Sequence, residues 1–505
     1  MKVLLSVYDK TGLVDFARGL VELGHELIAS GGTAAALGEA GIAHATVESL
    51  TEAPEMLGGR VKTLHPRLHG GILADLSKPQ HVSDLAGQGI EPIGLVVCNL
   101  YPFRSNPSIE LIDVGGPTMV RAAGKNWAHV GCVVDAADYG EVLDELRRDG
   151  ALSDGLRRRL AATAFAHTAA YDAAIANWFS ERAAEGDLPA TVHLSLERAQ
   201  TLRYGENPHQ RGARYREIGQ PSWWDDVVQH GGKELSYLNL YDADAAWRLA
   251  HQLADLGPVA AVVVKHANPC GAAVAENPLA AYERAFECDP MSAFGGIVAL
   301  TARVTEAIAA EMVANAQADV LIAPGFDEGA LDLFAAKRKN MRVLAAPAPD
   351  AHAAVWHWRQ LSGGWLLQDP YVFATGRKEW TVASKVQPTE DNWRDMELAW
   401  RVCAWVKSNA IVLAARGMAV GIGGGQQNRV TPGEIATARA AGRAKGGAAA
   451  SDAFFPFRDG LDACAAAGVA AVIQPGGSVR DGEVIAAADE HGLVMVLTGE
   501  RQFQH

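Results

Sequence analysis

The stretch KVLLSVYDKTGLVDFARGLVELGHELIASGGT, residues 2–33, decides the fold of the first part of the chain. The apolar run 2–7 predicts a strand, and the apolar residues between Leu13 and Leu20 follow at the spacing of one helix face. HELIAS (25–30), a short helix and IAHATV (42–47) complete a β-α-β-α-β pattern. Strands alternating with helices predict a mostly parallel, doubly wound α/β sheet that binds ligands beyond the carboxyl ends of its strands.

The bulk composition narrows the class of protein. A chain of 505 residues is too long for one core, so we expect at least two domains. Its formal charge of −14 argues against DNA or RNA as a partner. No apolar run approaches the ~20 residues of a membrane span, and the amino terminus lacks a signal cleavage site, so we expect a cytoplasmic protein. The six cysteines are scattered without a C-x-x-C pair, which suggests neither disulfides nor a zinc ribbon.

Three segments are expected along the chain. Further strands of the first sheet are predicted at 94–100 and 129–135, followed by an alanine-rich helical stretch at 155–186. We place a domain boundary near residue 190, which gives domains 1–190 and 191–505. A weaker joint near 345–365 divides the second domain into αβ subdomains of about 191–350 and 351–505, consistent with a duplicated unit without a strict sequence period.

Two loops of the first domain suit a phosphorylated ligand. Ser30-Gly31-Gly32-Thr33 lies between a predicted strand and helix, where free backbone N–H groups and hydroxyls can hold a phosphate, although a simple turn explains it equally well. GGRVKTLHPRLHGG (58–71) brings five basic residues together but lacks P-loop spacing, which removes the main support for an ATPase. The alternative for this segment is a solvated basic loop.

Side chains capable of proton transfer follow nearby. Asn99 and Tyr101 come at the end of the strand VVCNLYPF, and IDVGGPTMVRAAGKN contains Asp113 and Lys125. A phenol, a carboxylate and an ammonium at loop ends can exchange protons. Taken singly, Asp113 could be a helix cap, Lys125 a surface residue and Tyr101 a packed aromatic.

A second group of functional residues is predicted where AAVVVKHANPCG (260–271) ends a buried strand in Lys265 and His266. Consecutive strand residues point to opposite faces, so these two share a site only if the strand turns, and we expect the turn at Asn268-Pro269. Ala273 stands where the second cysteine of a zinc deaminase would be, so no zinc site is completed. His266 is then free to act as a general base and Lys265 to stabilise an oxyanion.

Other loops add polar groups, with Arg203, Tyr204, Asn409 and Arg429 among them. GGGQQNRV misses the dinucleotide-binding glycine spacing, which disfavours a dinucleotide site. SDAFFPFRD offers Phe454 and Asp459, which could hold a pterin-like ring, although packing alone would also explain the phenylalanines.

Together these strings resemble the bifunctional purine biosynthesis enzymes, in which a phosphoribosylaminoimidazolecarboxamide formyltransferase is joined to an IMP cyclohydrolase. The resemblance spans the chain, through SVYDKTG, ASGGT, GGRVKTLHP, CNLYPF, IDVGGPTMVRAAGKN, LRYGENPHQ, VVKHANPCGAA, SAFGGIVAL, GIGGGQQNRV, SDAFFPFRDG and QPGGSVRD. It implies a methylglyoxal-synthase-like first domain, followed by tandem cytidine-deaminase-like domains without the catalytic zinc.

The resemblance implies that the first domain closes the formylated nucleotide FAICAR to IMP with loss of water. It assigns proton and charge handling to Lys125, Asp113, Tyr101 and Lys62. It assigns nucleotide binding to Tyr8, Asp9, Lys10, Ser30, Gly31, Gly32, Thr33, Arg60, Val61, Thr63, Cys98, Asn99 and Val114.

The second domain would transfer a formyl group from 10-formyltetrahydrofolate to the amine of AICAR. His266 is implied as the base, Lys265 as the group that stabilises the oxyanion or protonates the departing folate nitrogen, and Asn409 as a further catalytic residue. Binding of AICAR is assigned to Arg203, Tyr204, Asn239, Gly295, Asp319, Arg429 and Arg501. Binding of the folate is assigned to Val430, Phe454, Asp459, Ser478 and Val479.

The resemblance also implies a homodimer with transformylase sites at the subunit interface and no catalytic metal. The chain departs from the family pattern at Tyr8, where a serine is usual, and at Leu238, which replaces an asparagine. Two alternatives stay open: an enzyme with one working half, and a non-catalytic purine or folate sensor.

Overall fold

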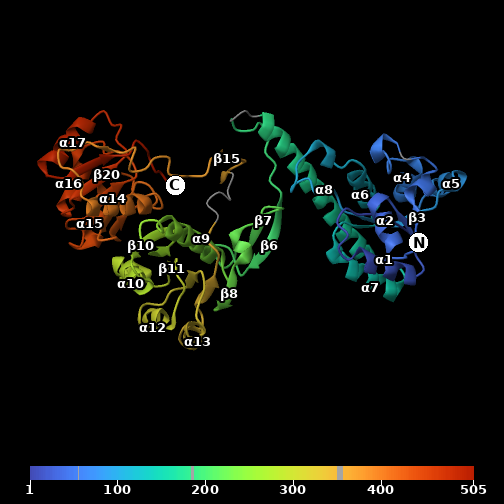
Figure 1. Cartoon of the computed structure of the whole chain (residues 1–505), viewed down its shortest axis with the longest axis horizontal. Coiled ribbons are helices and arrows are strands. Elements are labelled where there is room, and N and C mark those ends of the chain that lie inside the picture. The colour runs from blue at the N-terminus through green and yellow to red at the C-terminus, as the bar shows by residue number, and fades with distance from the viewer. Residues whose placement is uncertain (55, 184–186, 350–355) are drawn as a thin grey trace. The chain divides into compact units, whose positions relative to one another are not determined.

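The computed structural model describes residues 1–54, 56–183, 187–349 and 356–505. The chain forms two compact units, drawn in Figure 1. Unit 1 contains Met1–Glu197 and Glu217–Gln220, and unit 2 contains Arg198–Arg216 and Pro221–His505. The functional boundary expected near residue 190 stays a prediction. The joint expected at 345–365 falls partly on residues 350–355, which lie outside the described residues.

Unit 1 is built on a five-stranded sheet in which all neighbouring strands are parallel, in the order β3-β2-β1-β4-β5. Its strands are β1 Lys2–Ser6, β2 Glu26–Ala29, β3 Ala45–Thr46, β4 Ile93–Cys98 and β5 Gly131–Val133. Its helices are α1 Leu13–Glu22, α2 Gly31–Glu39, α3 Val47–Thr51, α4 Pro66–Leu73, α5 Pro79–Gly87, α6 Gly115–Lys125, α7 Tyr139–Asp149 and α8 Asp154–Ala183. The predicted doubly wound parallel sheet is confirmed.

Both faces of this sheet are buried, because successive side chains of a strand point in opposite directions. Val3 and Leu5 enter one core with residues of α1, α2 and α7, while Leu4 enters a second core with residues of α4, α6 and α8. The strand order reverses between β1 and β4, whose last residues, Ser6 and Cys98, are paired in register. In such sheets the ligand crevice lies beyond the strand ends at this reversal.

Unit 2 contains one mixed sheet of twelve strands, in the order β16-β21-β20-β19-β17-β18-β10-β9-β11-β12-β13-β8. Its strands are β8 Val228–Gly231, β9 Val259–Lys265, β10 Asn268–Ala275, β11 Ile297–Leu300, β12 Val320–Ala323, β13 Arg342–Ala345, β16 Thr381–Val382, β17 Ile411–Ala415, β18 Met418–Gly423, β19 Ala448–Ser451, β20 Ala471–Gln474 and β21 Val494–Leu497. Its helices are α9 Tyr237–Gln252, α10 Pro278–Cys288, α11 Pro290–Ala293, α12 Glu306–Ala314, α13 Glu328–Lys337, α14 Glu390–Cys403, α15 Val430–Ala440, α16 Arg458–Ala466 and α17 Asp481–Glu490.

Two short hairpin-like sheets complete the strands. They are β6 Leu196–Leu202 with β7 Gly212–Glu217, and β14 His357–Leu361 with β15 Gly364–Gln368. Helix α10 is capped by Asn277, whose side chain accepts a hydrogen bond from the backbone of Ala280 at 2.9 Å, and Pro278 opens the helix.

The twelve-stranded sheet is a duplication. From its centre outward, one block runs β10-β9-β11-β12-β13 and the other runs β18-β17-β19-β20-β21. Gly271 in β10 and Gly421 in β18 are equivalent, since a Cβ on either would lie about 2 Å from a helix carbonyl oxygen. The blocks meet in the antiparallel pair β10–β18 and share one hydrophobic core. The duplicated αβ unit suggested by the sequence is therefore present, while the likeness to cytidine deaminases stays a prediction.

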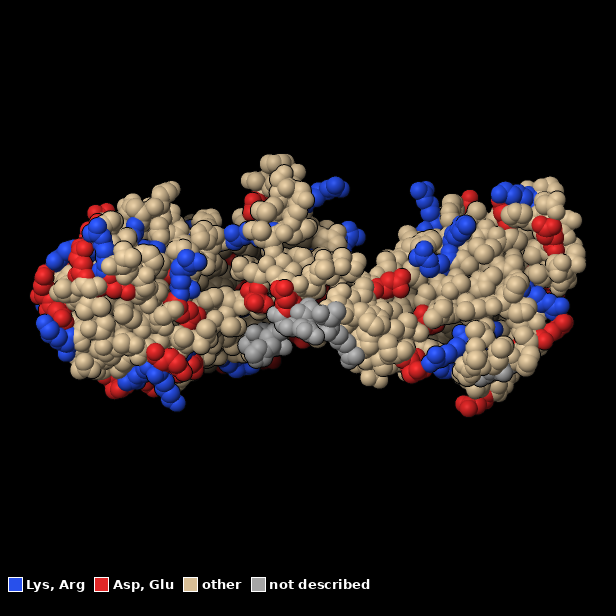
Figure 2. Space-filling model, turned by 90° about the horizontal axis from the view of Figure 1, so that it is seen from above, with Lys and Arg blue, Asp and Glu red and all other residues tan. Residues whose placement is uncertain are grey.

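Charged side chains of both signs are interspersed on the face drawn in Figure 2, without a broad area of either sign. Among the helices of the described residues, none combines the length and the apolar character that crossing a membrane requires.

Candidate active sites

The first candidate site lies beyond the carboxyl ends of β1, β2 and β4. Asn99, directly after β4, binds the loop that follows β1: its Oδ1 accepts from the backbone N–H groups of Tyr8 at 2.6 Å and Asp9 at 3.0 Å. Its Nδ2 donates to the Asp9 carbonyl at 2.9 Å. Three hydrogen bonds from one amide therefore fix the loop containing Tyr8, Asp9 and Lys10.

The Gly31-Gly32 turn at the start of α2 is flanked by two ammonium groups. A Cβ on Gly31 would lie 4.0 Å from Lys62 Nζ, and one on Gly32 would lie 3.6 Å from Lys10 Nζ. A helix amino terminus with two nearby cations suits a phosphate. The hydroxyl groups of the motif have partners already, since Thr33 Oγ1 bonds both backbone groups of Val7 and Ser30 Oγ bonds Ser6 Oγ at 2.8 Å.

Three basic side chains of the segment 58–71 are paired with acids, and one of them is Arg67, which forms an ion pair with Glu52 at 2.8 Å. Lys62 forms an ion pair with Glu48, and Arg60 makes two bonds to Glu110, at 2.7 and 2.8 Å. Burial acts to raise the pKa of Glu48, but the hydrogen bond and charge of Lys62 leave it below its usual value. Thr63 is buried against the start of α6. The segment is therefore docked on the sheet edge, with its cations held there by carboxylates.

Asp113 and Tyr101 lie together at this edge. Asp113 Oδ1 accepts from the backbone of Gly116 at 2.8 Å, so the residue also binds an N–H group in the first turn of α6. Burial raises the pKa of Asp113, against hydrogen bonds from the backbones of Gly116 and Tyr101. Burial and the nearby Asp113 raise the pKa of Tyr101. A carboxyl group whose pKa is raised holds its proton to a higher pH than usual, and beside a phenol it can exchange that proton.

Two other predicted residues are placed differently. The Cys98 side chain is 1% exposed, and burial raises the pKa of its thiol, so a ligand can meet this residue only through its backbone. Lys125 is the last residue of α6, and at 1.5 Å per residue its Cα lies roughly 15 Å from the start of the helix. Within a single chain, Lys125 therefore does not reach the Asp113 carboxyl group. The catalytic role of Lys125 stays a prediction.

In unit 2 the strand β9 ends at Lys265, as expected, but the predicted turn at Asn268-Pro269 is wrong. The turn consists of His266 and Ala267, with φ of 54° and 55°, and Asn268-Pro269 begins β10. Two positive φ angles between paired strands are characteristic of a two-residue hairpin loop of type I′, so backbone pairing overrides the local turn signals. His266 is exposed at the tip, and Lys265 Nζ donates to the Phe294 carbonyl at 2.5 Å, beside Gly295.

The β10–β18 pair brings the two blocks of unit 2 to one sheet edge. Because these strands are antiparallel, the start of β10 lies beside the end of β18. Asn268 makes the connection: its Oδ1 accepts from the backbone of Lys407 at 3.1 Å, and its Nδ2 donates to the His266 carbonyl at 3.0 Å. The His266 turn and the segment leading to Asn409 are therefore neighbours.

Asn409 belongs to a buried polar cluster. Arg429 donates to Asn409 Oδ1 at 2.5 Å and forms an ion pair with Asp452, which is 0% exposed. Asp452 also accepts from Ser408 Oγ and from the backbone of Ala410 at 3.1 Å. These contacts fix Asn409 and Arg429 relative to each other, because every group in the cluster has a partner.

Five further residues predicted to bind AICAR precede β13 in unit 2: Arg203, Tyr204, Asn239, Gly295 and Asp319. Arg203 donates to the Tyr204 hydroxyl at 2.7 Å. Asp319 interacts with Arg342: burial lowers the pKa of the Arg342 guanidinium, and the charge of Asp319 acts to raise it. Asn239 lies in the first turn of α9, where it forms a capping box with Ser236. Gly295 and Asp319 precede β11 and β12, so in this block the site lies at the amino ends of those strands.

The residues predicted to bind folate follow the strands of the second block. Val430 opens α15, Phe454 follows β19, Asp459 is in α16, and Ser478 and Val479 precede α17. Arg501 follows β21, and its guanidinium lies 4.4 Å from the ring of Phe503. Phe454 and Val479 are exposed, which leaves apolar surface at this edge for a planar ring.

Three residues at these sites were not predicted from the sequence. Tyr171 in α8 accepts from the backbone of Asp113 at 2.8 Å and donates to the carbonyl of Leu111 at 2.6 Å. Asp242 in α9 binds the His266 turn, and Asp452 binds Arg429. Each acts on a predicted residue that is distant in sequence, so no local pattern could reveal it.

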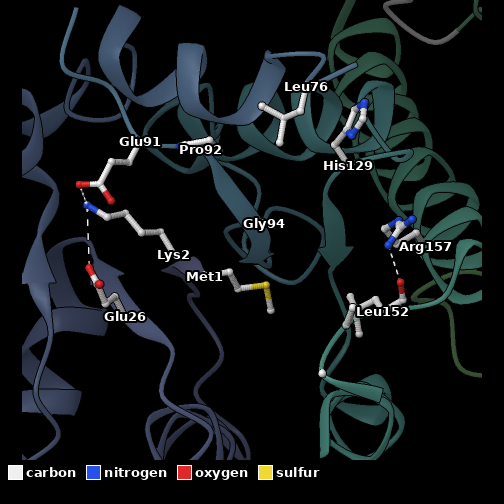
Figure 3. Close-up of a pocket in the computed structure, with 12 residues that line it drawn as sticks. Met1, Lys2, Glu26, Leu76, Glu91, Pro92, Gly94, His129, Leu152 and Arg157 are labelled. Atoms are coloured by element: carbon white, nitrogen blue, oxygen red, sulfur yellow. Dashed lines mark hydrogen bonds and ion pairs between the residues drawn. The ribbon is translucent and has the colours of Figure 1, made fainter. Parts of the chain in front are cut away.

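No group of three or more histidine, cysteine or acidic side chains in the described part of the chain is arranged to hold a metal ion. A hollow of about 590 Å³ lies at the opposite edge of the unit 1 sheet, near Met1 and Gly94 (Figure 3). Its cations are bonded within the protein, with Lys2 paired to Glu91 at 3.0 Å.

Comparison with known proteins identifies the family. A family model described as AICARFT/IMPCHase bienzyme matches residues 123–439, and one described as an MGS-like domain matches residues 12–118. "Bifunctional purine biosynthesis protein PurH" of Myxococcus xanthus (strain DK1622) is 50% identical over 522 aligned positions that span both whole chains. The chain belongs to the AICARFT/IMPCHase bienzyme family. This bienzyme is therefore an AICAR formyltransferase and an IMP cyclohydrolase of purine biosynthesis, and its first unit has the expected MGS-like fold.

Among solved structures, a chain from "Crystal structure of ForH" is 38% identical to this bienzyme and covers 35% of it and 98% of its own length. Its TM-score of 0.33 is too low to inform the fold.

Proposed function

We propose that the two sheet edges described above are the two active sites of the bienzyme. The edge of unit 1 would close FAICAR to IMP, and the edge of unit 2 would transfer the formyl group to AICAR. The observation that carries this proposal is the β10–β18 pairing, because it sets the exposed His266 beside the Asn409–Arg429 cluster.

In ring closure, the carboxamide nitrogen of FAICAR attacks its own formyl carbon, and the tetrahedral adduct then loses water. Gly31, Gly32, Lys10 and Lys62 would hold the phosphate, which orients the two reacting groups of the same molecule. Asp113 and Tyr101 would move the proton from the amide nitrogen to the departing hydroxyl. The raised pKa of Asp113 supports this role, because a carboxyl group titrating nearer to neutral pH can both give and take a proton.

In formyl transfer, the amine of AICAR attacks the formyl carbon of 10-formyltetrahydrofolate, and the folate nitrogen leaves. The amine is a weak nucleophile because its lone pair is delocalised, so His266 would take its proton as the new C–N bond forms. Lys265 would stabilise the oxyanion or protonate the departing folate nitrogen. Asn409 and Arg429 would hold the nucleotide, and the exposed Phe454 would support the folate ring.

Two assays test these assignments separately. Incubation with AICAR and 10-formyltetrahydrofolate should give IMP, and synthetic FAICAR alone should also give IMP. His266→Ala should abolish the first reaction and leave the second intact. Arg416→Ala, at the equivalent turn position of the other block, should leave both intact. Full formyl transfer by His266→Ala would contradict the assignment of the base, and FAICAR closing at the uncatalysed rate would indicate one working half.

The family resemblance further supports a cytoplasmic homodimer with the transformylase sites at its interface. Sedimentation equilibrium should give about twice the chain mass of 53.5 kDa. A monomer that retains full formyl transfer at the assay concentration would contradict an interfacial site.

A further inference from the structure

The hairpin loop that contains His266 is held by a residue from another element. Asp242 in α9 accepts with Oδ2 from the backbone N–H of His266 at 3.2 Å and with Oδ1 from that of Ala267 at 2.8 Å. Asp242 is 8% exposed, so this carboxylate contacts the loop from inside the protein. Both backbone donors of the loop are therefore bound by one buried carboxylate.

The loop needs this support because its sequence does not favour its shape. His266 and Ala267 both adopt positive φ, a conformation that favours glycine or asparagine and strains other residues. Local rules are broken in this way mainly at functional sites, where other contacts must hold the strained backbone.

The other block contains the same arrangement without the histidine. Asp395 in α14 accepts from the backbone of Arg416 at 2.9 Å and of Gly417 at 2.8 Å. Glycine occupies the second loop position there, so this loop matches its conformation better. Because of the antiparallel β10–β18 pair, the Arg416 loop lies at the opposite edge of the sheet, away from Asn409 and Arg429. The duplication thus supplies a structural copy of the loop that is remote from the chemistry.

We propose that Asp242 is a positioning residue for formyl transfer, which fixes the His266 imidazole by binding both backbone donors of its strained hairpin loop. This inference rests on the proposed role of His266 as the base. A small displacement of a catalytic group can lower the rate by as much as 100-fold, so the loss should appear in kcat more than in AICAR binding.

The experiment compares Asp242→Ala and the milder Asp242→Asn with Asp395→Ala and Asp395→Asn in the full-length protein. The Asp242 variants should lower kcat for formyl transfer by about 10- to 100-fold, with the KM for AICAR changed less than about threefold. The Asp395 variants should lower the melting temperature about as much as the Asp242 variants do. Unlike the Asp242 variants, they should keep kcat within about twofold of the wild-type value. Closure of FAICAR, which takes place in unit 1, should be unchanged in all four proteins, and the melting temperature reports whether unit 2 is folded.

A second substitution separates positioning from general damage. Ala267→Gly in the Asp242→Asn background gives the first loop the residue that the second loop has, and it should restore part of the lost kcat. Asp242 variants with unaltered kcat, or Asp395 variants with an equal loss of kcat, would overturn the proposal. His266→Ala, assayed in parallel, tests the underlying assignment: if it retains full transfer, His266 is not the base whatever the Asp242 variants show.

Discussion

Replacing Asp452 by asparagine should strongly destabilise unit 2. Arg429 and Asp452 form an ion pair whose side chains are 8% and 0% exposed. Removal of one partner from a buried pair costs about 3–5 kcal/mol, because the other charge is left buried without compensation. The Ser408 hydroxyl and the backbone of Ala410 lose a charged acceptor at the same time. We therefore expect Asp452→Asn to lower the free energy of unfolding by about 3–5 kcal/mol.

Urea unfolding monitored by tryptophan fluorescence measures this loss, since ten of the 12 tryptophans follow residue 220 and report on unit 2. The matched control is Asp462→Asn, because the pair of Asp462 with Arg458 is 36% and 38% exposed. A surface pair of this kind contributes at most about 1 kcal/mol. Formyl transfer by Asp452→Asn should also fall, because Arg429 and Asn409 lose their anchor.

A double variant, Arg429→Met with Asp452→Leu, tests whether the uncompensated buried charge of Arg429 causes the loss of stability. Replacing both members of a buried pair with apolar residues is often neutral, so the double variant should recover most of the stability although it is inactive in formyl transfer. A loss below about 1 kcal/mol in Asp452→Asn, or a double variant less stable than Asp452→Asn alone, would refute the reasoning.

Three further outcomes are expected. Gly421→Ala would place its Cβ 2.1 Å from a carbonyl oxygen of α15 and should destabilise unit 2 by about 1–3 kcal/mol in urea, whereas Gly482→Ala, with open space around it, should not. Gly31→Ala adds a side chain at a φ of 48° next to the predicted phosphate site, so the KM for FAICAR should rise about tenfold with formyl transfer unchanged. Burial raises the pKa of Asp113 above 3.8, so its contribution to stability is complete below that pH and is lost as the pH rises through the raised value. Calorimetry should therefore show that, as the pH rises above about 4, Asp113→Asn loses less stability than the wild type.

Unit 1 could be predicted from its sequence because its signals are local. The strand before Tyr8 and the glycine pair at Gly31 follow one another in the order in which the parallel sheet uses them. The position of Asn99 and Asp113 at the edge of the sheet followed from the rule that ligands bind beyond the carboxyl ends of parallel strands. What could not be predicted is the pairing of Lys62 with Glu48, which depends on how two loops dock.

Unit 2 was predicted less completely because its sites depend on distant contacts. Lys265 and His266 were identified as candidates, since charged groups directly after a buried strand are unfavourable unless they have partners. Their turn was misplaced because Asn268-Pro269 carries the local turn signals, whereas His266-Ala267 adopts its shape through the paired strands and Asp242. Asp452 was missed because nothing near it in the sequence shows that an aspartate after a short strand is fully buried.

The central β10–β18 pair also has a consequence for synthesis on the ribosome. Met418, the register partner of Ala273, is made 145 residues after it. At 5–20 residues per second, one side of β10 waits roughly 7–29 s for its neighbour. An unpaired strand edge invites association with other chains during that time. Pro269, which cannot donate a hydrogen bond, and the small residues that follow it make the waiting edge of β10 a poor template for such association.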